Sequence, residues 1–222
     1  MRSSITLAAL GIAFALAPHA LADAPSLAPA PLEPAHEWRF AVSIDAIPVG
    51  EHRYVVTDEG EVRRVSVDAR FRVHLLVVDA YVWEQHVDET WRGNCLASLA
   101  SRTVEQGRVT TVAGHVRDDA FVVRGAKGEV VLPGCQMTFA YWNPQVLAQR
   151  ELINAQTGEA TPVEVEHLHD DTQAVRGVTL PTQHWRMRTA RNTIELWYST
   201  AGDWVAMRTT TRDGHVVVYR LV

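Results

Sequence analysis

Apolar and polar residues alternate over most of the chain beyond residue 37, which is the pattern of β-strands that bury one face. The clearest run covers residues 65–77, where every odd position is apolar and the even positions up to His74 are polar or charged. At about 3.3 Å per residue this run is longer than a flat strand in an ordinary domain, so we expect it to bend or to carry a bulge. The pattern therefore predicts a strongly curled sheet.

Turns that contain glycine separate this run from many shorter ones. The last turn, Asp213-Gly214, is a hairpin signal because both residues tolerate a positive φ. Regular short strands with such turns are typical of an antiparallel barrel or sandwich. The predicted fold class is all-β, with an antiparallel, strongly curled sheet or an open β-barrel. Further strands are expected at residues 38–45, 51–57, 79–91, 96–105, 108–116, 120–124, 129–132, 162–167, 184–189, 193–198, 204–212 and 215–222.

One segment interrupts the strand pattern and carries the signals of a helix. Asn143 can cap its N-terminus, Pro144 fits its first turn, and the following residues can continue it toward Asn154. A single short helix among many strands is expected to lie across one end of the curled sheet, as a plug or a lid.

The N-terminus has the three parts of a cleaved signal peptide. Arg2 is basic, residues 5–17 form an apolar run, and Ala20-Leu21-Ala22 is a small-x-small cleavage site. The run of about 13 residues is shorter than the roughly 20 that a membrane-spanning helix needs. The sequence therefore predicts cleavage near Ala22, no membrane span, and a periplasmic or secreted protein.

Composition changes once more after the signal peptide. Residues 23–36 are rich in proline and alanine, as in an extended linker. Residues 37–222 show no second break and no internal repeat, and their length fits one domain. The predicted organisation is a signal peptide at residues 1–22, a linker at 23–36 and a single β-barrel-like domain at 37–222.

Charge and motifs exclude several classes of function. The chain has 26 acidic and 21 basic residues with interspersed charges, so it lacks the basic stripe of a nucleic-acid-binding protein. It also lacks a G-x-S-x-G nucleophile elbow, an H-E-x-x-H motif, a phosphate-binding glycine-rich loop and a dinucleotide fingerprint. The sequence therefore implies no nucleic-acid partner and no cofactor.

Cys95 and Cys135 are the only cysteines in the chain. In an exported protein, such an isolated pair is expected to form a disulfide. Closing a loop of about 40 residues would stabilise the fold by about 4 kcal/mol in the chain-entropy model. A redox or zinc pair is the alternative, which the absence of a C-x-x-C motif disfavours.

Glu89 is the candidate residue for chemistry. If the strand from residue 79 keeps its register, Glu89 shares one face with aromatic residues. A carboxylate is costly to bury there unless it is paired or protonated, and a protonated carboxyl can act as a general acid, with His86 as a second candidate. The alternative is a salt bridge to an arginine at the sheet rim. The residues expected on this face are Tyr81, Trp83, Gln85, Val87, Glu89 and Trp91.

A short histidine cluster offers a second candidate site. His167-Leu168-His169 places two imidazoles on one face of a strand, a spacing that can chelate a metal, and Asp170-Asp171 follows. A polar loop is expected at this point, however, and solvated turn residues explain the cluster without a ligand. No metal site is predicted.

An ordered series of aromatic, cysteine and glycine motifs runs along the chain. Its members are Tyr81-x-Trp83, His86, Glu89-x-Trp91-x-x-x-Cys95-Leu96, Cys135, Phe139-Ala140-Tyr141-Trp142-Asn143-Pro144, Leu152-Ile153-Asn154-x-Gln156-Thr157-Gly158, Leu196-Trp197-Tyr198 and the last hairpin, residues 204–219. Together they resemble the exported bacterial domain-of-unknown-function family number 6134, a resemblance that implies no known activity. More distantly, the hairpin-rich pattern is similar to the open barrels of periplasmic lipoprotein carriers, at the level of the fold.

Three functional interpretations follow. In the first, aromatic residues line a concave face that binds or carries an apolar or amphipathic, lipid-like molecule. In the second, the cavity holds a small substrate, and Glu89 with His86 performs proton transfer as in an isomerase or hydrolase. In the third, the chain is an accessory subunit of another periplasmic protein. Independently of these, the aromatic residues could simply fill the barrel. We favour binding, because the sequence lacks a convergence of titratable groups. The expected ligand-binding residues are Tyr81, Trp83, Glu89, Trp91, Tyr141 and Trp142.

Overall fold

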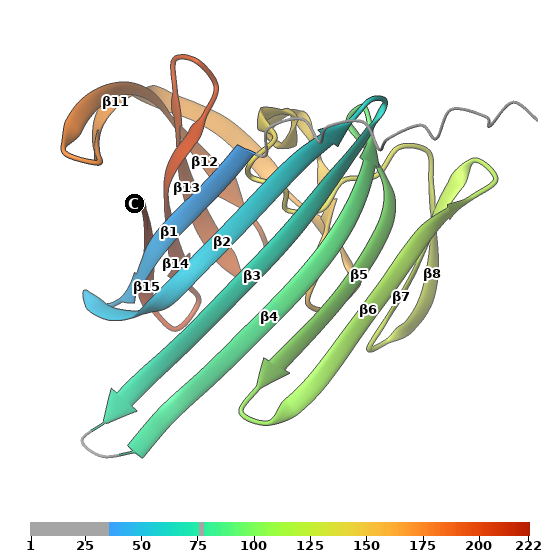
Figure 1. Ribbon diagram of the computed structural model, residues 1–222, viewed down its shortest axis with the longest axis horizontal. Helices are drawn as coiled ribbons and strands as arrows, with labels where there is room; N and C mark the ends of the chain where they lie inside the picture. The colour runs from blue at the N-terminus through green and yellow to red at the C-terminus, as the bar shows by residue number, and fades with distance from the viewer. Residues whose placement is uncertain (1–35, 76–77) are drawn as a thin grey trace, which may run out of the picture. The chain divides into compact units, whose positions relative to one another are not determined.

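Antiparallel strands make up nearly all of the regular structure (Figure 1). The computed structural model describes residues 36–75 and 78–222, so the predicted signal peptide and all but the last residue of the predicted linker lie outside the described residues. Thirteen strands form one sheet in the order β11-β12-β13-β14-β15-β1-β2-β3-β4-β5-β6-β7-β8, and β9 and β10 pair separately. The elements are β1 (His36–Ile44), β2 (Ile47–Glu59), β3 (Val62–Leu75), β4 (Val78–Arg92), β5 (Cys95–Glu105), β6 (Arg108–Arg117), β7 (Ala120–Gly125), β8 (Gly128–Pro133), the 3₁₀ helix η1 (Pro144–Ala148), β9 (Glu151–Ile153), β10 (Ala160–Pro162), β11 (Glu164–Val175), β12 (Val178–Arg188), β13 (Asn192–Ser199), β14 (Trp204–Thr211) and β15 (Val216–Leu221).

Strand β1 joins two meanders into this sheet. It pairs with β2 on one side and with β15 on the other, so that Phe40 lies opposite both His52 and Leu221. The sheet stays open in the described part of the chain, because its edge strands β8 and β11 are not hydrogen-bonded to each other. The predicted all-β class, an antiparallel curled sheet or open barrel, is confirmed.

The alternation read from the sequence sets which face is buried. Val65, Val67 and Ala69 of β3 are buried, whereas Arg64 and Arg70 are exposed. The same inner face carries Phe40 of β1, whose ring lies 4.2 Å from the Trp204 ring between centroids. The main core therefore lies on one face of the sheet, and a second, smaller cluster is formed by Val175, Trp197, Val205 and Ala206.

Strands β11 and β12 are longer than predicted. Residues 168–175 and 178–183 are strand, so the polar loop expected around residues 168–171 is wrong. Strand β11 is an edge strand with few buried side chains, and polar residues such as Asp170 are compatible with that position. Polarity therefore failed as a loop signal at this edge.

Residues 134–163 connect β8 to β11, the two opposite edges of the sheet. The helix in this crossover segment starts as predicted, with the Asn143 side chain accepting a hydrogen bond from the Gln145 backbone N–H at 3.0 Å, but it is a single 3₁₀ element of five residues. The predicted continuation toward Asn154 is wrong, because Glu151–Ile153 forms β9 and pairs with β10. No helix among the described residues, η1 included, is long and apolar enough to cross a membrane.

Buried residues fix the crossover segment against the core. Val146, Leu152 and Ile153 are all fully buried, and the Ile153 N–H donates to the Met137 carbonyl oxygen at 2.8 Å. The turn between β9 and β10 also approaches β7 closely. A Cβ atom on Gly125 would lie 2.0 Å from the Thr157 carbonyl oxygen, so only glycine fits there.

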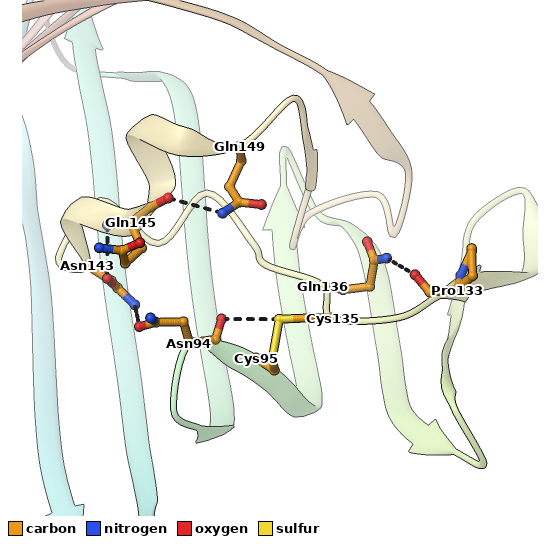
Figure 2. The surroundings of a disulfide bond; sticks show 8 residues. All are labelled: Asn94, Cys95, Pro133, Cys135, Gln136, Asn143, Gln145 and Gln149. Atoms are coloured by element: carbon orange, nitrogen blue, oxygen red, sulfur yellow. Dashed lines mark hydrogen bonds between the residues drawn. A yellow bond between two sulfur atoms is a disulfide. The ribbon is translucent and has the colours of Figure 1, made fainter.

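The predicted disulfide joins Cys95, at the start of β5, to Cys135, at the start of the crossover segment, with Cα atoms 5.0 Å apart (Figure 2). Beside it, the Leu96 N–H donates to the Gln136 carbonyl oxygen at 2.8 Å. The Asn143 amide donates to Asn94 Oδ1 at 3.3 Å, which ties the cap of η1 to the same β4–β5 turn. The disulfide therefore anchors the point where the crossover segment leaves the sheet.

We expect removal of this disulfide to destabilise the fold. In the double variant Cys95→Ser/Cys135→Ser, the free energy of unfolding should fall by about 2–4 kcal/mol, because the unfolded chain loses a long closed loop. Urea titrations of the variant and of the oxidised protein measure the difference. Equal unfolding midpoints with equal slopes would show that the bridge is not formed or does not stabilise the protein.

Candidate functional site

A cavity of about 460 Å³ lies between the inner face of the sheet and the crossover segment. Its size is in the range of small-molecule sites in proteins. Apolar and aromatic side chains from β2, β3, β4, β13, β14 and β15 line it together with the crossover segment. These lining residues are Tyr54, Val67, Trp83, Val87, Phe139, Tyr141, Trp142, Ile194, Met207 and Tyr219.

Glu89 supplies a buried carboxyl group to this cavity. The Thr138 hydroxyl donates to Glu89 Oε1 at 2.8 Å, and the Trp91 indole donates to Oε2 at 2.9 Å. Burial raises the pKa of the Glu89 carboxyl to about 7, although both hydrogen bonds act in the opposite direction. The alternative of a salt bridge between Glu89 and an arginine is not found among the described ion pairs. The Glu89 carboxyl therefore changes its protonation state near neutral pH.

Trp91 and Trp142 pack against each other beside Glu89. Trp91 is fully buried, and its ring meets that of Trp142 edge to face at 5.4 Å. On β4, Trp83 lies six residues before Glu89, a separation of roughly 20 Å along an extended strand. Glu89 and Trp83 therefore belong to one aromatic and aliphatic wall that runs along β4.

His52 is a second buried polar group on the wall, and sequence reasoning missed it. Only 9% of the residue is exposed, and neither ring nitrogen has a hydrogen-bond partner. Its ring stacks on Tyr54 at 4.5 Å, and burial lowers the pKa of the imidazole to about 3, so it stays neutral. The signal was available, because His52 shares the parity of Tyr54 and Val56 in a predicted strand. A neutral imidazole can both donate and accept a hydrogen bond, so it gives the cavity an unused polar contact.

The remaining predicted residues separate into three groups. Trp83, Tyr141 and Trp142 line the cavity with Glu89, as expected. Trp91 lies behind the wall and acts on the cavity through its hydrogen bond to Glu89. Tyr81 is not among the lining residues; its hydroxyl donates to Glu105 at 2.9 Å, one strand away.

His86 lies on the opposite face of β4. Its side chain is 52% exposed, with Nδ1 2.8 Å from Asp68 and Nε2 3.0 Å from Asp88. The hydrogen bond to Asp68 raises the pKa of this imidazole, as does Asp88. Because side chains alternate along a strand, His86 cannot share a site with Glu89, and the acid–base pair expected from the sequence is not formed.

Two polar loops form the rim of the cavity. One is the β9–β10 turn, residues 154–159, and the other is the β12–β13 turn, which carries Arg191. Glu159 pairs with Lys127, and Arg191 adds a further positive charge near this carboxylate. The site thus combines an apolar interior, a neutral or ionised carboxyl and a charged rim.

The pKa of Glu89 predicts a pH-dependent stability. The pKa of Glu89 is about 7 in the folded protein, above the ordinary value of 4.5. Between these two pH values the folded protein holds a proton that the unfolded chain has released. The contribution of Glu89 to stability is therefore full below pH 4.5 and is lost as pH rises through 7, by about 3 kcal/mol in all.

Unfolding experiments on Glu89→Gln measure this effect. The stability of the wild type relative to the variant should decrease by about that amount between pH 4.5 and 8. Glu84→Gln, on the exposed face of the same strand, serves as the control and should follow the wild type. A wild-type-minus-variant difference that does not change with pH would contradict the raised pKa.

Comparisons with known proteins agree with this architecture. No curated protein matches the sequence. A crystal structure from Brucella abortus, described as a beta-barrel-like protein of domain of unknown function DUF1849, is similar with a TM-score of 0.64. The identity is 12% over 85% of this chain and 95% of that chain, so the likeness concerns the fold alone. The sequence profile of the domain of unknown function DUF6134 matches residues 40–222, and the chain therefore belongs to the DUF6134 family.

Proposed function

We propose that the concave face of this protein binds an amphipathic, lipid-like small molecule in the cavity that Glu89 lines. The observation that carries the proposal is a cavity with an aromatic and aliphatic interior that also holds two buried polar groups, Glu89 and His52. An apolar ligand body would replace water along the wall, and each buried methylene would contribute about 0.8 kcal/mol.

The two buried polar groups limit the ligand further. His52 has no partner for either ring nitrogen, and a buried polar group without a hydrogen bond costs about 1–3 kcal/mol. A ligand hydroxyl, carbonyl or carboxyl group can satisfy it. Glu89, when protonated, has an O–H that can donate in the same way. A purely apolar ligand would leave His52 without a hydrogen-bond partner, which favours an amphipathic one.

The location of the rim supports the same class of ligand. Arg191 is exposed at the β12–β13 turn, and Lys127 reaches the β9–β10 turn through Glu159. A polar or anionic head group can lie at this rim while the apolar part occupies the interior. Binding or carriage of this kind also fits the export that the N-terminal residues predict.

A fluorescent amphiphile tests the proposal. We expect N-phenyl-1-naphthylamine to gain fluorescence in the presence of the protein, and palmitate or lysophosphatidylcholine to displace it. Trp83→Ala should weaken binding about 10-fold, because burying an aromatic side chain against the ligand contributes at least 1.4 kcal/mol. The titration gives the dissociation constant directly.

Tyr81→Ala is the matched control, since Tyr81 lies two residues away on the same strand but outside the cavity lining. It should bind as the wild type does. Thermal unfolding of both variants shows that they are folded. Equal loss in both variants, or no displaceable binding at all, would refute the proposal.

Acid–base catalysis by Glu89 is the second candidate, supported by a pKa near 7 inside a cavity. Measurements of affinity and turnover in the variant Glu89→Gln distinguish the two functions. A binding protein should keep most of its affinity for the amphiphile in this variant. An enzyme would also keep its affinity for the ligand in this variant, but it would no longer convert a substrate identified among the molecules that copurify with the protein.

A further inference from the structure

A β-bulge in the edge strand β11 turns two neighbouring histidines to opposite faces of the sheet. The pairing between β11 and β12 shifts between His167 and His169. His167 lies against Trp185, with ring centroids 4.8 Å apart, and His169 lies against His184 at 5.0 Å. The expectation that His167 and His169 share one face is therefore wrong, because the bulge changes the parity.

The same bulge assembles a different group of side chains on the outer face. His169, Asp171 and His184 bring one ligand atom each within 4.8 Å of one another. Around a tetrahedral ion with bonds near 2.0–2.1 Å, ligand atoms lie roughly 3.3 Å apart. Small side-chain rotations therefore suffice to close these three groups around one ion. The cluster lies outside the cavity lining that contains Glu89.

His184 is placed as a metal ligand would be. Only 6% of the residue is exposed, and neither ring nitrogen has a hydrogen-bond partner. Its ring stacks on Trp197 at 4.2 Å, and Nε2 lies 3.7 Å from Glu195 Oε1. Metal-bound histidines commonly direct their second nitrogen toward a carboxylate, which is the relation of His184 to Glu195. Glu195 itself is held by Arg208.

Asp171 is held in position by neighbours on two sides. The Trp197 indole donates to Asp171 Oδ2 at 3.1 Å, and the Thr172 N–H donates to Oδ1 at 2.7 Å. Trp197 therefore contacts both proposed ligands, Asp171 through its indole N–H and His184 through its ring face.

We propose that His169, Asp171 and His184 form a binding site for a divalent transition-metal ion of the zinc type. Two imidazoles and one carboxylate match the ligand preference of zinc, whereas calcium and magnesium prefer oxygen ligands. Three protein ligands leave a fourth position for water, and the exposed side of His169 faces solvent. The ion would join edge strand β11 to β12 next to the bulge.

Calorimetric titration of the full chain, purified without a histidine tag, with zinc chloride tests the site. We expect one equivalent to bind. His169→Ala should weaken this binding by at least about 100-fold, beyond the 10–100-fold effect of losing an outer partner. His169 is exposed, so this variant should fold.

His167→Ala is the matched control, two residues away and directed to the other face, and it should bind zinc as the wild type does. Copper(II), a second probe of the same ligands, should quench part of the tryptophan fluorescence because Trp197 contacts the site, and this quenching should be lost with His169→Ala and persist with His167→Ala. No binding of one equivalent, or equal loss in the two variants, would overturn the proposal.

Discussion

The chain has to cross the concave face of its own sheet, because β8 and β11 lie at opposite edges and residues 134–163 connect them. A buried connection must satisfy its backbone polar groups, and this one does so through β9–β10 pairing, the turn at Asn154 and hydrogen bonds to β5. The disulfide and the Thr138–Glu89 hydrogen bond fix its first part to β5 and β4. The cavity exists because this segment covers the inner face without filling it.

This arrangement explains why a carboxyl group is buried at all. Glu89 joins the sheet to the crossover segment through Thr138, and Trp91 holds its second oxygen. Burial costs the ionised form and raises the pKa, so the same contact that supports the fold produces a group that titrates near neutral pH. The structural role of Glu89 and its raised pKa are thus two consequences of one location.

The sequence predicted those features that depend on local pattern. Alternation in β3, the glycine turns and the cysteine pair led to the sheet and the disulfide, and parity along β4 led to Trp83 and Glu89. Parity also places His86 on the other face, so its assignment beside Glu89 was an avoidable error. The bulge at His167–His169 and the end of η1 depend on tertiary pairing. No residue type in either segment predicts them. His52 was missed because a histidine on an apolar face is a weak signal.

We propose that the cavity lined by Glu89 holds an amphipathic molecule in the cell. Native mass spectrometry of the protein purified from the cells that make it, before and after denaturation, tests this most directly. A lipid-sized adduct that is present in the native spectrum and released on denaturation is the predicted result. A single mass equal to that of the polypeptide in both spectra, unchanged after incubation with a lipid extract, would contradict the claim.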